Sequence, residues 1–222
     1  MFQQNENNPL APERLIPNAN TSDLGAYTLV TYRKDRWRFQ VGARFDNRTI
    51  ETKDEDFIPA VLKQYRGYNY SAGIARLAKK SSIRLNVSSG FRAPTSSELL
   101  SDGIHHGAFR YERGNVALAT EKAVQIDFSY AFHFDDLEII VNPFYNRIRD
   151  YIYLSNSGEL VEDLPLFEYE QADYAQLYGV DFGFHYHPHE AHWLHVESSL
   201  SSVFAEDMSR NPLPLIPQTR LN

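Results

Sequence analysis

The stretch Arg36-Trp37-Arg38-Phe39-Gln40-Val41-Gly42-Ala43-Arg44-Phe45-Asp46 alternates apolar and polar side chains almost without a break. Successive side chains of a β-strand point to opposite faces, so one face of this strand is apolar and the other carries Arg, Gln and Asp. The same period recurs at 123–134 and 178–187, and weaker repeats cover 24–32, 67–76, 82–90, 137–146 and 193–203. A further strand begins at 218–222. The pattern predicts an all-β chain of about eight or nine strands.

The connections between these strands alternate in length. Short polar turns are predicted at 33–36, 78–81, 133–136 and 188–191, and long segments at about 47–66, 91–121, 147–176 and 204–217. Every second connection of an up-and-down antiparallel sheet lies on the same edge, so one edge would carry tight turns and the other long loops. This asymmetry is typical of a transmembrane β-barrel. Only one short helical turn is expected, beginning at Thr95 with Glu98 completing a capping box.

Composition excludes several classes of protein. The 222 residues fit one domain, and no stretch approaches the ~18 apolar residues that a spanning helix needs. The net charge of −7 makes nucleic acid an unsuitable partner. The absence of cysteine excludes disulfides and thiol catalysis. Neither a glycine-rich phosphate loop nor a nucleophile elbow is present, so we expect neither enzymatic activity nor a cofactor.

The polar strand faces leave two architectures open. Such a face meets water inside a wide membrane barrel, or outside a soluble β-sandwich that binds carbohydrate or protein. In the sandwich, the apolar strand faces would pack against each other. Aromatic residues near strand ends favour a membrane belt, although aromatics prefer strands in general. The belt candidates are Tyr27, Tyr32, Trp37, Phe45, Tyr130, Phe132, Phe144, Tyr145, Tyr178, Tyr186 and Trp193.

Residues 88–115 read Ser-Ser-Gly-Phe-Arg-Ala-Pro-Thr-Ser-Ser-Glu-Leu-Leu-Ser-Asp-Gly-Ile-His-His-Gly-Ala-Phe-Arg-Tyr-Glu-Arg-Gly-Asn. Within this stretch Pro94 biases the residue before it towards extended backbone and ends the strand. The stretch resembles the late-barrel signature of TonB-dependent outer-membrane receptors. The matching elements are Gly90 to Pro94, Glu98-Leu99, Gly114-Asn115 and Glu121-Lys122, and the segments 143–152, 178–181 and 216–221 resemble later parts of the family barrel.

The resemblance implies a receptor in the outer membrane of a Gram-negative bacterium, in contact with outer-membrane lipid. Such receptors take up a scarce nutrient: a metal, siderophore-bound iron, heme or a cobalamin-type molecule. Their outer loops capture the ligand, and the energy-transducing TonB protein acts through a plug domain. Family barrels have about 22 strands, so we expect residues 1–222 to be a partial, C-terminal-half barrel domain without the plug or the final strands. Residues 1–8 do not resemble a signal peptide, which fits an internal piece of an exported chain or a cytosolic protein.

Candidate ligand contacts lie in two of the long segments. They are Arg92, Glu98, Asp102, His105, His106 and Glu112 in 91–121, and Phe167 and Tyr169 in 147–176. Imidazoles and carboxylates suit Zn, Cu, Ni or Fe, but the adjacent His105 and His106 would share an ion only if the backbone bends. His185 and His187 share one strand face and form a second possible metal pair. The alternative for both pairs is that they are solvated side chains.

Overall fold

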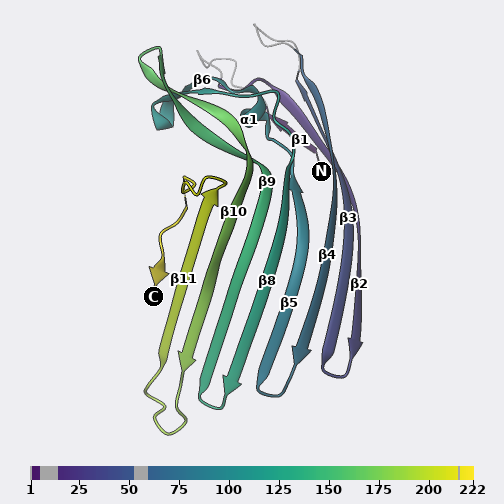
Figure 1. Ribbon diagram of the computed structural model, residues 1–222, viewed down its shortest axis with the longest axis vertical. Coiled ribbons are helices and arrows are strands. Elements are labelled where there is room, and N and C mark those ends of the chain that lie inside the picture. Colours follow the sequence, from purple (N-terminus) through teal and green to yellow (C-terminus); the bar gives the residue numbers. More distant parts are fainter. Residues whose placement is uncertain (1, 6–14, 53–59, 215) are drawn as a thin grey trace.

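The computed structural model describes residues 2–5, 15–52, 60–214 and 216–222, which form one curved sheet of long strands (Figure 1). The strand order is β1-β2-β3-β4-β5-β8-β9-β10-β11-β12, and neighbours in this order pair antiparallel. Among the described residues the sheet has 12 strands and is not closed into a barrel. The strands of this path are β1 (Phe2–Asn5), β2 (Ala19–Lys34), β3 (Trp37–Thr52), β4 (Leu62–Leu77), β5 (Ser81–Arg92), β8 (Glu121–Phe134), β9 (Leu137–Val161), β10 (Leu164–Tyr186), β11 (Val196–Asp207) and β12 (Arg220–Leu221).

The predicted all-β, up-and-down arrangement is confirmed. All eight predicted full-length strands are present, and the ninth begins at β12. Three of the four tight turns are also confirmed, between β2 and β3, β4 and β5, and β8 and β9. The fourth is wrong in length, because residues 187–195 separate β10 from β11. The elements that the long segment 91–121 contributes are α1 (Ser96–Leu100), β6 (Asp102–His105), the 3-10 turn η1 (His106–Ala108) and β7 (Arg110–Arg113).

The prediction of a long loop at 147–176 is wrong. Strands β9 and β10 continue through it and meet at a tight turn formed by Glu162 and Asp163, whose φ angles are 52° and 63°. Aspartate, as at residue 163, adopts this left-handed backbone more readily than most residues. The long segment predicted at 47–66 is likewise shorter, since β3 runs to Thr52 and β4 starts at Leu62. Residues 53–59 of that segment lie outside the described residues.

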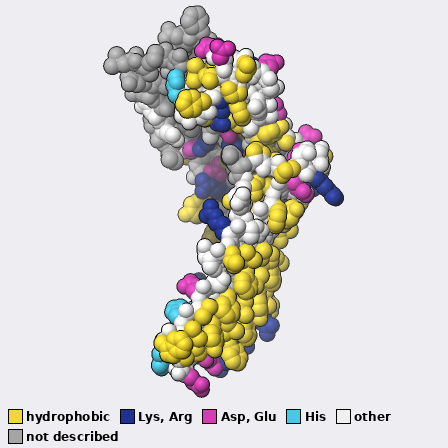
Figure 2. Space-filling view, turned by 90° about the vertical axis from the view of Figure 1, so that its left-hand side faces the viewer, with side chains coloured by type: hydrophobic (Ala, Val, Ile, Leu, Met, Phe, Trp, Pro, Cys, Tyr) yellow, Lys and Arg dark blue, Asp and Glu magenta, His cyan; other side chains and the backbone are white. Residues whose placement is uncertain are grey.

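The apolar face of the sheet is exposed. Cross-strand pairing aligns Phe39, Ile74, Leu85 and Phe128 in one row across four strands, and each is 37–42% exposed. Hydrophobic side chains gather over the lower part of the molecule, the end with the tight turns (Figure 2). A soluble sandwich would bury this face against a second sheet, so that alternative is wrong. An exposed apolar face on a curved sheet is the arrangement of a lipid-facing barrel wall.

The opposite face of the sheet is polar. Two aromatic residues predicted for the apolar belt, Tyr27 and Phe144, lie on this polar face because they pair with Arg44 and Asp127. They therefore belong to the interior of the curve. No helix among the described residues has the length and apolar character needed to cross a membrane.

A small buried core lies at the end of the sheet away from the tight turns. Leu99 and Leu100 of α1 are 1% and 7% exposed, and they cluster with Ile50 of β3, Tyr65 of β4 and Ile152 of β9. Burying such side chains is worth about 1.5–3 kcal/mol each. The core thus fixes α1 onto the ends of β3, β4 and β9.

Candidate functional site

Two segments meet above this core. One is residues 93–120, which we call the capping segment, and the other is the end of the β9–β10 hairpin at residues 150–172, which we call the projecting hairpin. Strand β8 pairs with β9 only as far as Arg149, and beyond that point the hairpin leaves the wall (Figure 1). Strand β7 of the capping segment then pairs in parallel with β10, with Tyr111 opposite Leu166 and Glu112 opposite Phe167. The two segments therefore form one hydrogen-bonded unit.

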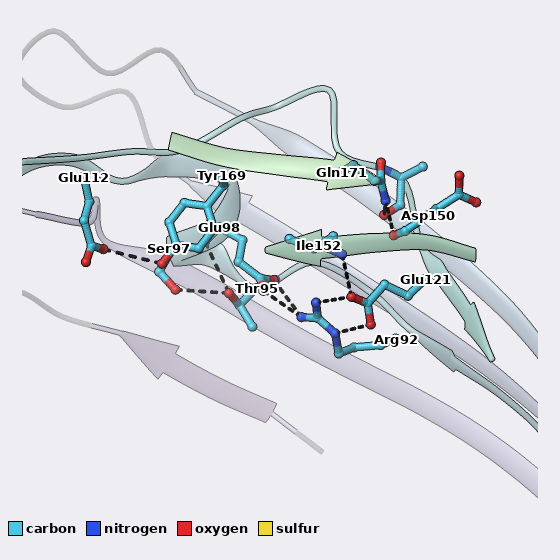
Figure 3. Close-up of polar contacts among 11 residues, drawn as sticks. Arg92, Thr95, Ser97, Glu98, Glu112, Glu121, Asp150, Ile152, Tyr169 and Gln171 are labelled. Atoms are coloured by element: carbon cyan, nitrogen blue, oxygen red, sulfur yellow. Dashed lines mark hydrogen bonds and ion pairs between the residues drawn. The ribbon is translucent and has the colours of Figure 1, made fainter. Parts of the chain in front are cut away.

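Arg92 joins the wall to the capping segment. Its Nε and Nη2 donate to the two carboxylate oxygens of Glu121 at 2.6 and 2.7 Å, and its Nη1 donates to Glu98 at 2.8 Å (Figure 3). Glu121, 7% exposed, also accepts a hydrogen bond from the backbone N–H of Ile152 at 2.8 Å. We call Arg92, Glu98 and Glu121 the latch. Bidentate guanidinium–carboxylate pairing fixes orientation as well as distance, so the latch connects β5, α1, β8 and β9.

The predicted capping box of α1 is confirmed and orients one member of the latch. The Thr95 hydroxyl accepts from the backbone N–H of Glu98 at 3.2 Å, and the Glu98 carboxylate accepts from the backbone N–H of Thr95 at 2.7 Å. The same carboxylate faces Arg92. The Glu98 side chain thus caps the N-terminus of the helix and also completes the ion pair.

Gln171 clamps the base of the projecting hairpin. Its side-chain amide donates to the carbonyls of Ala119 and Asp150 at 3.0 and 2.6 Å, and its carbonyl accepts from the N–H of Ala119 at 3.0 Å. Asp150 has a φ of 55°, where the hairpin bends away from the wall. The ligand-site prediction missed Gln171 and Glu121. Glu121 stands in the family-like Glu-Lys pair, whereas Gln171 carries no pattern that could have identified it.

Three predicted site residues come together near the middle of the projecting hairpin. Glu112 is 3% exposed and its carboxylate lies 2.6 Å from Nη2 of Arg110. The Tyr169 hydroxyl donates to Glu112 at 3.4 Å, and the Arg110 guanidinium lies 5.0 Å from the ring centre of Phe167. A buried carboxylate requires such partners. The cluster is a charged pair with aromatic walls.

Three tyrosines of this unit have raised pKa values. Burial, reinforced by the nearby Glu112 carboxylate, raises the pKa of Tyr169 to about 12. Burial and the hydrogen bond to Asp102 raise the pKa of Tyr111 to about 12. The hydrogen bond to Glu170, followed by burial, raises the pKa of Tyr153 to about 12. In each case the neutral phenol is the form that the folded unit favours.

These pKa values predict alkaline lability of the unit. A phenol whose folded pKa lies above its unfolded value stabilises the fold fully below pH about 10 and loses that contribution as the pH rises towards 12. We expect the capping segment and the projecting hairpin to loosen over this window, before the wall does. This loosening is measured by following tyrosinate ultraviolet absorbance and the protease sensitivity of the capping segment as the pH rises. Glu112→Gln should lower the Tyr169 midpoint, and an unchanged midpoint would contradict the assigned cause.

The two predicted histidine pairs lie in different parts of the chain, one beside η1 and the other at the end of β10. The backbone bends at η1, directly after His105, but no group of three or more His, Asp or Glu side chains in the described part of the chain is arranged to hold a metal ion. The Asp102 carboxylate accepts from the Tyr111 hydroxyl at 2.9 Å. At the tight-turn end, the rings of His185 and His187 lie 4.6 and 5.4 Å from that of His195. Both metal pairs remain predictions.

Comparisons with known proteins agree on one family. A family model described as TonB dependent receptor-like, beta-barrel, matches residues 2–222. The copper transporter OprC superposes with a TM-score of 0.76 at 17% identity, over 91% of this chain and 32% of that one. The FrpB iron transporter from Neisseria meningitidis (F3-3 variant) gives a TM-score of 0.61 at 16% identity, over 86% of this chain and 27% of that one. No curated protein sequence matches significantly.

A third similar structure is the hemophore receptor HasR of Serratia marcescens, a double mutant in complex with its hemophore HasA and heme. Its TM-score is 0.66 at 13% identity, over 89% of this chain and 35% of that one. The chain thus spans about a third of the length of these three structures. At these identities the likeness concerns the fold.

Proposed function

The chain belongs to the TonB-dependent receptor β-barrel family, and from that premise we propose that it forms wall and outer loops of a receptor that takes up a metal or metal chelate across the outer membrane. Members of this family lie in the outer membrane of Gram-negative bacteria and bind small-molecule ligands. The proposed ligand class comprises a copper or iron ion, siderophore-bound iron, heme and a cobalamin-type molecule. Energy for uptake would come from TonB acting through a plug domain, and we expect no catalysis.

The observation that carries the proposal is the rigid attachment of the capping segment at one end of the wall. Loops held on a rigid scaffold commonly carry recognition. The latch and the Gln171 clamp hold this segment by its ends, while Phe109 at its turn is 77% exposed. Leu160, near the tip of the projecting hairpin, is 70% exposed. These exposed apolar groups are available to an organic chelate.

The charged candidates divide into two roles. Arg92, Glu98 and Glu112 are engaged in ion pairs within the unit, so we assign them to its support. His105 and His106 lie at the bend of η1, and we propose that they contact the metal or its chelate, with Phe167 and Tyr169 lining the approach. The copper, iron and heme ligands named for the similar structures support this class.

The test is a binding panel on the detergent-solubilised protein. Copper(II), iron(III), a ferric catecholate, heme and a cobalamin are titrated separately, with intrinsic fluorescence as the readout. We expect saturable binding of one probe, weakened at least about tenfold by a His105→Ala, His106→Ala double variant. His192→Ala, an exposed histidine at the tight-turn end, is the matched control and should bind normally. Absence of binding to every probe, or equal weakening by the control, would overturn the proposal.

A further inference from the structure

The exposed hydrophobic side chains of the apolar face form a surface that we call the hydrophobic belt. A hollow of about 740 Å³ opens at the margin of this belt that lies towards the long loops. It lies where β4 separates from β5: the two strands pair only from Ser71 and Ser88 towards the tight turns, although both continue towards the long loops. The Ser89 hydroxyl bridges the split, accepting from the N–H of Tyr70 at 2.7 Å and donating to its carbonyl at 3.3 Å. The hollow is therefore built by the strand geometry.

A glycine and an aromatic ring form the floor of the hollow. A Cβ at Gly67 would lie 2.2 Å from the ring of Phe91, so only glycine allows this ring to fill the gap between the strands. Tyr68 and Tyr70, 65% and 61% exposed, stand on one side, and Val124 is 51% exposed on the other. The walls are thus apolar and aromatic, and they continue into the hydrophobic belt.

Four cations surround the hollow: Arg66, Lys122, Arg147 and Arg149. All four are exposed, and none of the lining residues is acidic. Lys122 and Arg149 lie directly opposite each other on β8 and β9. Like charges in this position repel, which destabilises the sheet unless an anion lies between them.

On the opposite face of the sheet, at the level of the hollow, arginines are paired with carboxylates. There Arg48 lies 2.6 Å from Asp23, and Arg92 lies 2.6 Å from Glu121. Around the hollow, Arg66 donates to the neutral Gln64 at 3.2 Å and Arg147 lies 4.3 Å above the ring of Tyr174. Within the described residues, no ion pair is found for any of the four cations.

We propose that this hollow binds the phosphate headgroup of an anionic membrane lipid, whose acyl chains lie along the hydrophobic belt. Four cations around a hollow that no acidic residue lines suit a headgroup with two phosphates, since guanidinium groups bind phosphate oxygens bidentately. The apolar walls suit the upper parts of acyl chains, and the tyrosines suit the interface between chains and headgroups. A free phosphate ion would leave these apolar walls without a partner, so charge and surface together select a lipid.

The inference rests on the membrane placement in the proposed function. Protein extracted in mild detergent is delipidated and transferred to phosphatidylcholine nanodiscs that contain a few per cent of a diphosphorylated lipid A, and retained lipid is counted by native mass spectrometry. We expect one lipid A per protein. Each basic residue near a membrane surface contributes about fivefold in affinity, so an Arg66→Gln, Lys122→Gln, Arg149→Gln variant should bind about a hundredfold more weakly.

Arg76→Gln is the matched control, because Arg76 lies on the same strand as Arg66, on the same face, near the tight turns and 5.7 Å from the ring of Trp37. Heat-dependent gel mobility shows that each variant is folded in the bilayer. A folded triple variant that retains lipid A like the control would overturn the inference while leaving the proposed uptake intact. Displacement of the lipid by millimolar inorganic phosphate would also overturn it. A chain that fails to enter the bilayer at all contradicts the proposed function instead.

Discussion

Replacing Arg92 with alanine is expected to release the capping segment from the wall. The change leaves the carboxylates of Glu121 and Glu98 unpaired, and their side chains are only 9% and 15% exposed. Removing one partner of a fully buried pair costs about 3–5 kcal/mol. Arg92 itself is 40% exposed, so we expect about 2–3 kcal/mol of local stability to be lost. Hydrogen exchange of the amides between Thr95 and Leu118 should accelerate about 30- to 150-fold.

Two further variants identify the cause of this release. Arg113→Ala removes a different ion pair of the capping segment, the one with Glu168 of β10, whose side chains are 47% and 37% exposed. It should cost less than about 1 kcal/mol, because exposed ion pairs contribute little. Adding Glu121→Gln to Arg92→Ala removes the more buried of the two stranded charges while keeping an acceptor for the N–H of Ile152, and exchange should slow again. If Arg113→Ala and Arg92→Ala accelerate exchange equally, the latch has no special role.

The wall could be predicted from the sequence because each strand carries its own signal. The alternation at 36–46 needs only one apolar and one polar side of a sheet, and β3 follows it. The projecting hairpin could not be predicted in this way. The left-handed Asp150 and a register shift between Pro165 and Phe167 break the two-residue period. The position of the projecting hairpin depends on pairing between β10 and β7, which lie some fifty residues apart in sequence.

The sequence predicts which segment forms the candidate site, but it does not predict which contacts the individual side chains make there. The family-like motif places Arg92 and Glu98 in the capping segment and predicts them as ligand contacts, and the structure adds that they pair with each other. Their pairing depends on α1 packing over the strand ends, a tertiary arrangement without a local pattern. Gln171 acts through backbone groups of Ala119 and Asp150. Contacts to backbone leave no complementary side chain for sequence reasoning to find.

Gly114→Val is expected to displace α1 and with it one end of the latch. A Cβ at Gly114 would lie 2.5 Å from the backbone nitrogen of Leu100, and 2.6 and 2.7 Å from the carbonyl carbon and oxygen of Leu99. These are backbone atoms of a short helix, so no side-chain rotation can relieve the clash. Overpacking costs about 1–3 kcal/mol, and the rigid neighbours place valine near the upper end of that range.

The displaced helix should have a specific consequence. The backbone N–H of Gly114 donates to Ser101 at 2.6 Å and that of Asn115 donates to Glu98 at 2.8 Å, so a shift at residue 114 moves Glu98 away from Arg92. We expect faster protease cleavage of the capping segment and weaker ligand binding, with unchanged heat-dependent gel mobility because the wall is intact. Gly107→Ala is the matched control, since its Cβ would meet only His105 at 3.5 Å, an ordinary contact. Equal cleavage of the two variants would show that the close approach at Gly114 does not hold the helix, whereas loss of the mobility shift would show that the capping segment and the wall fold as one unit.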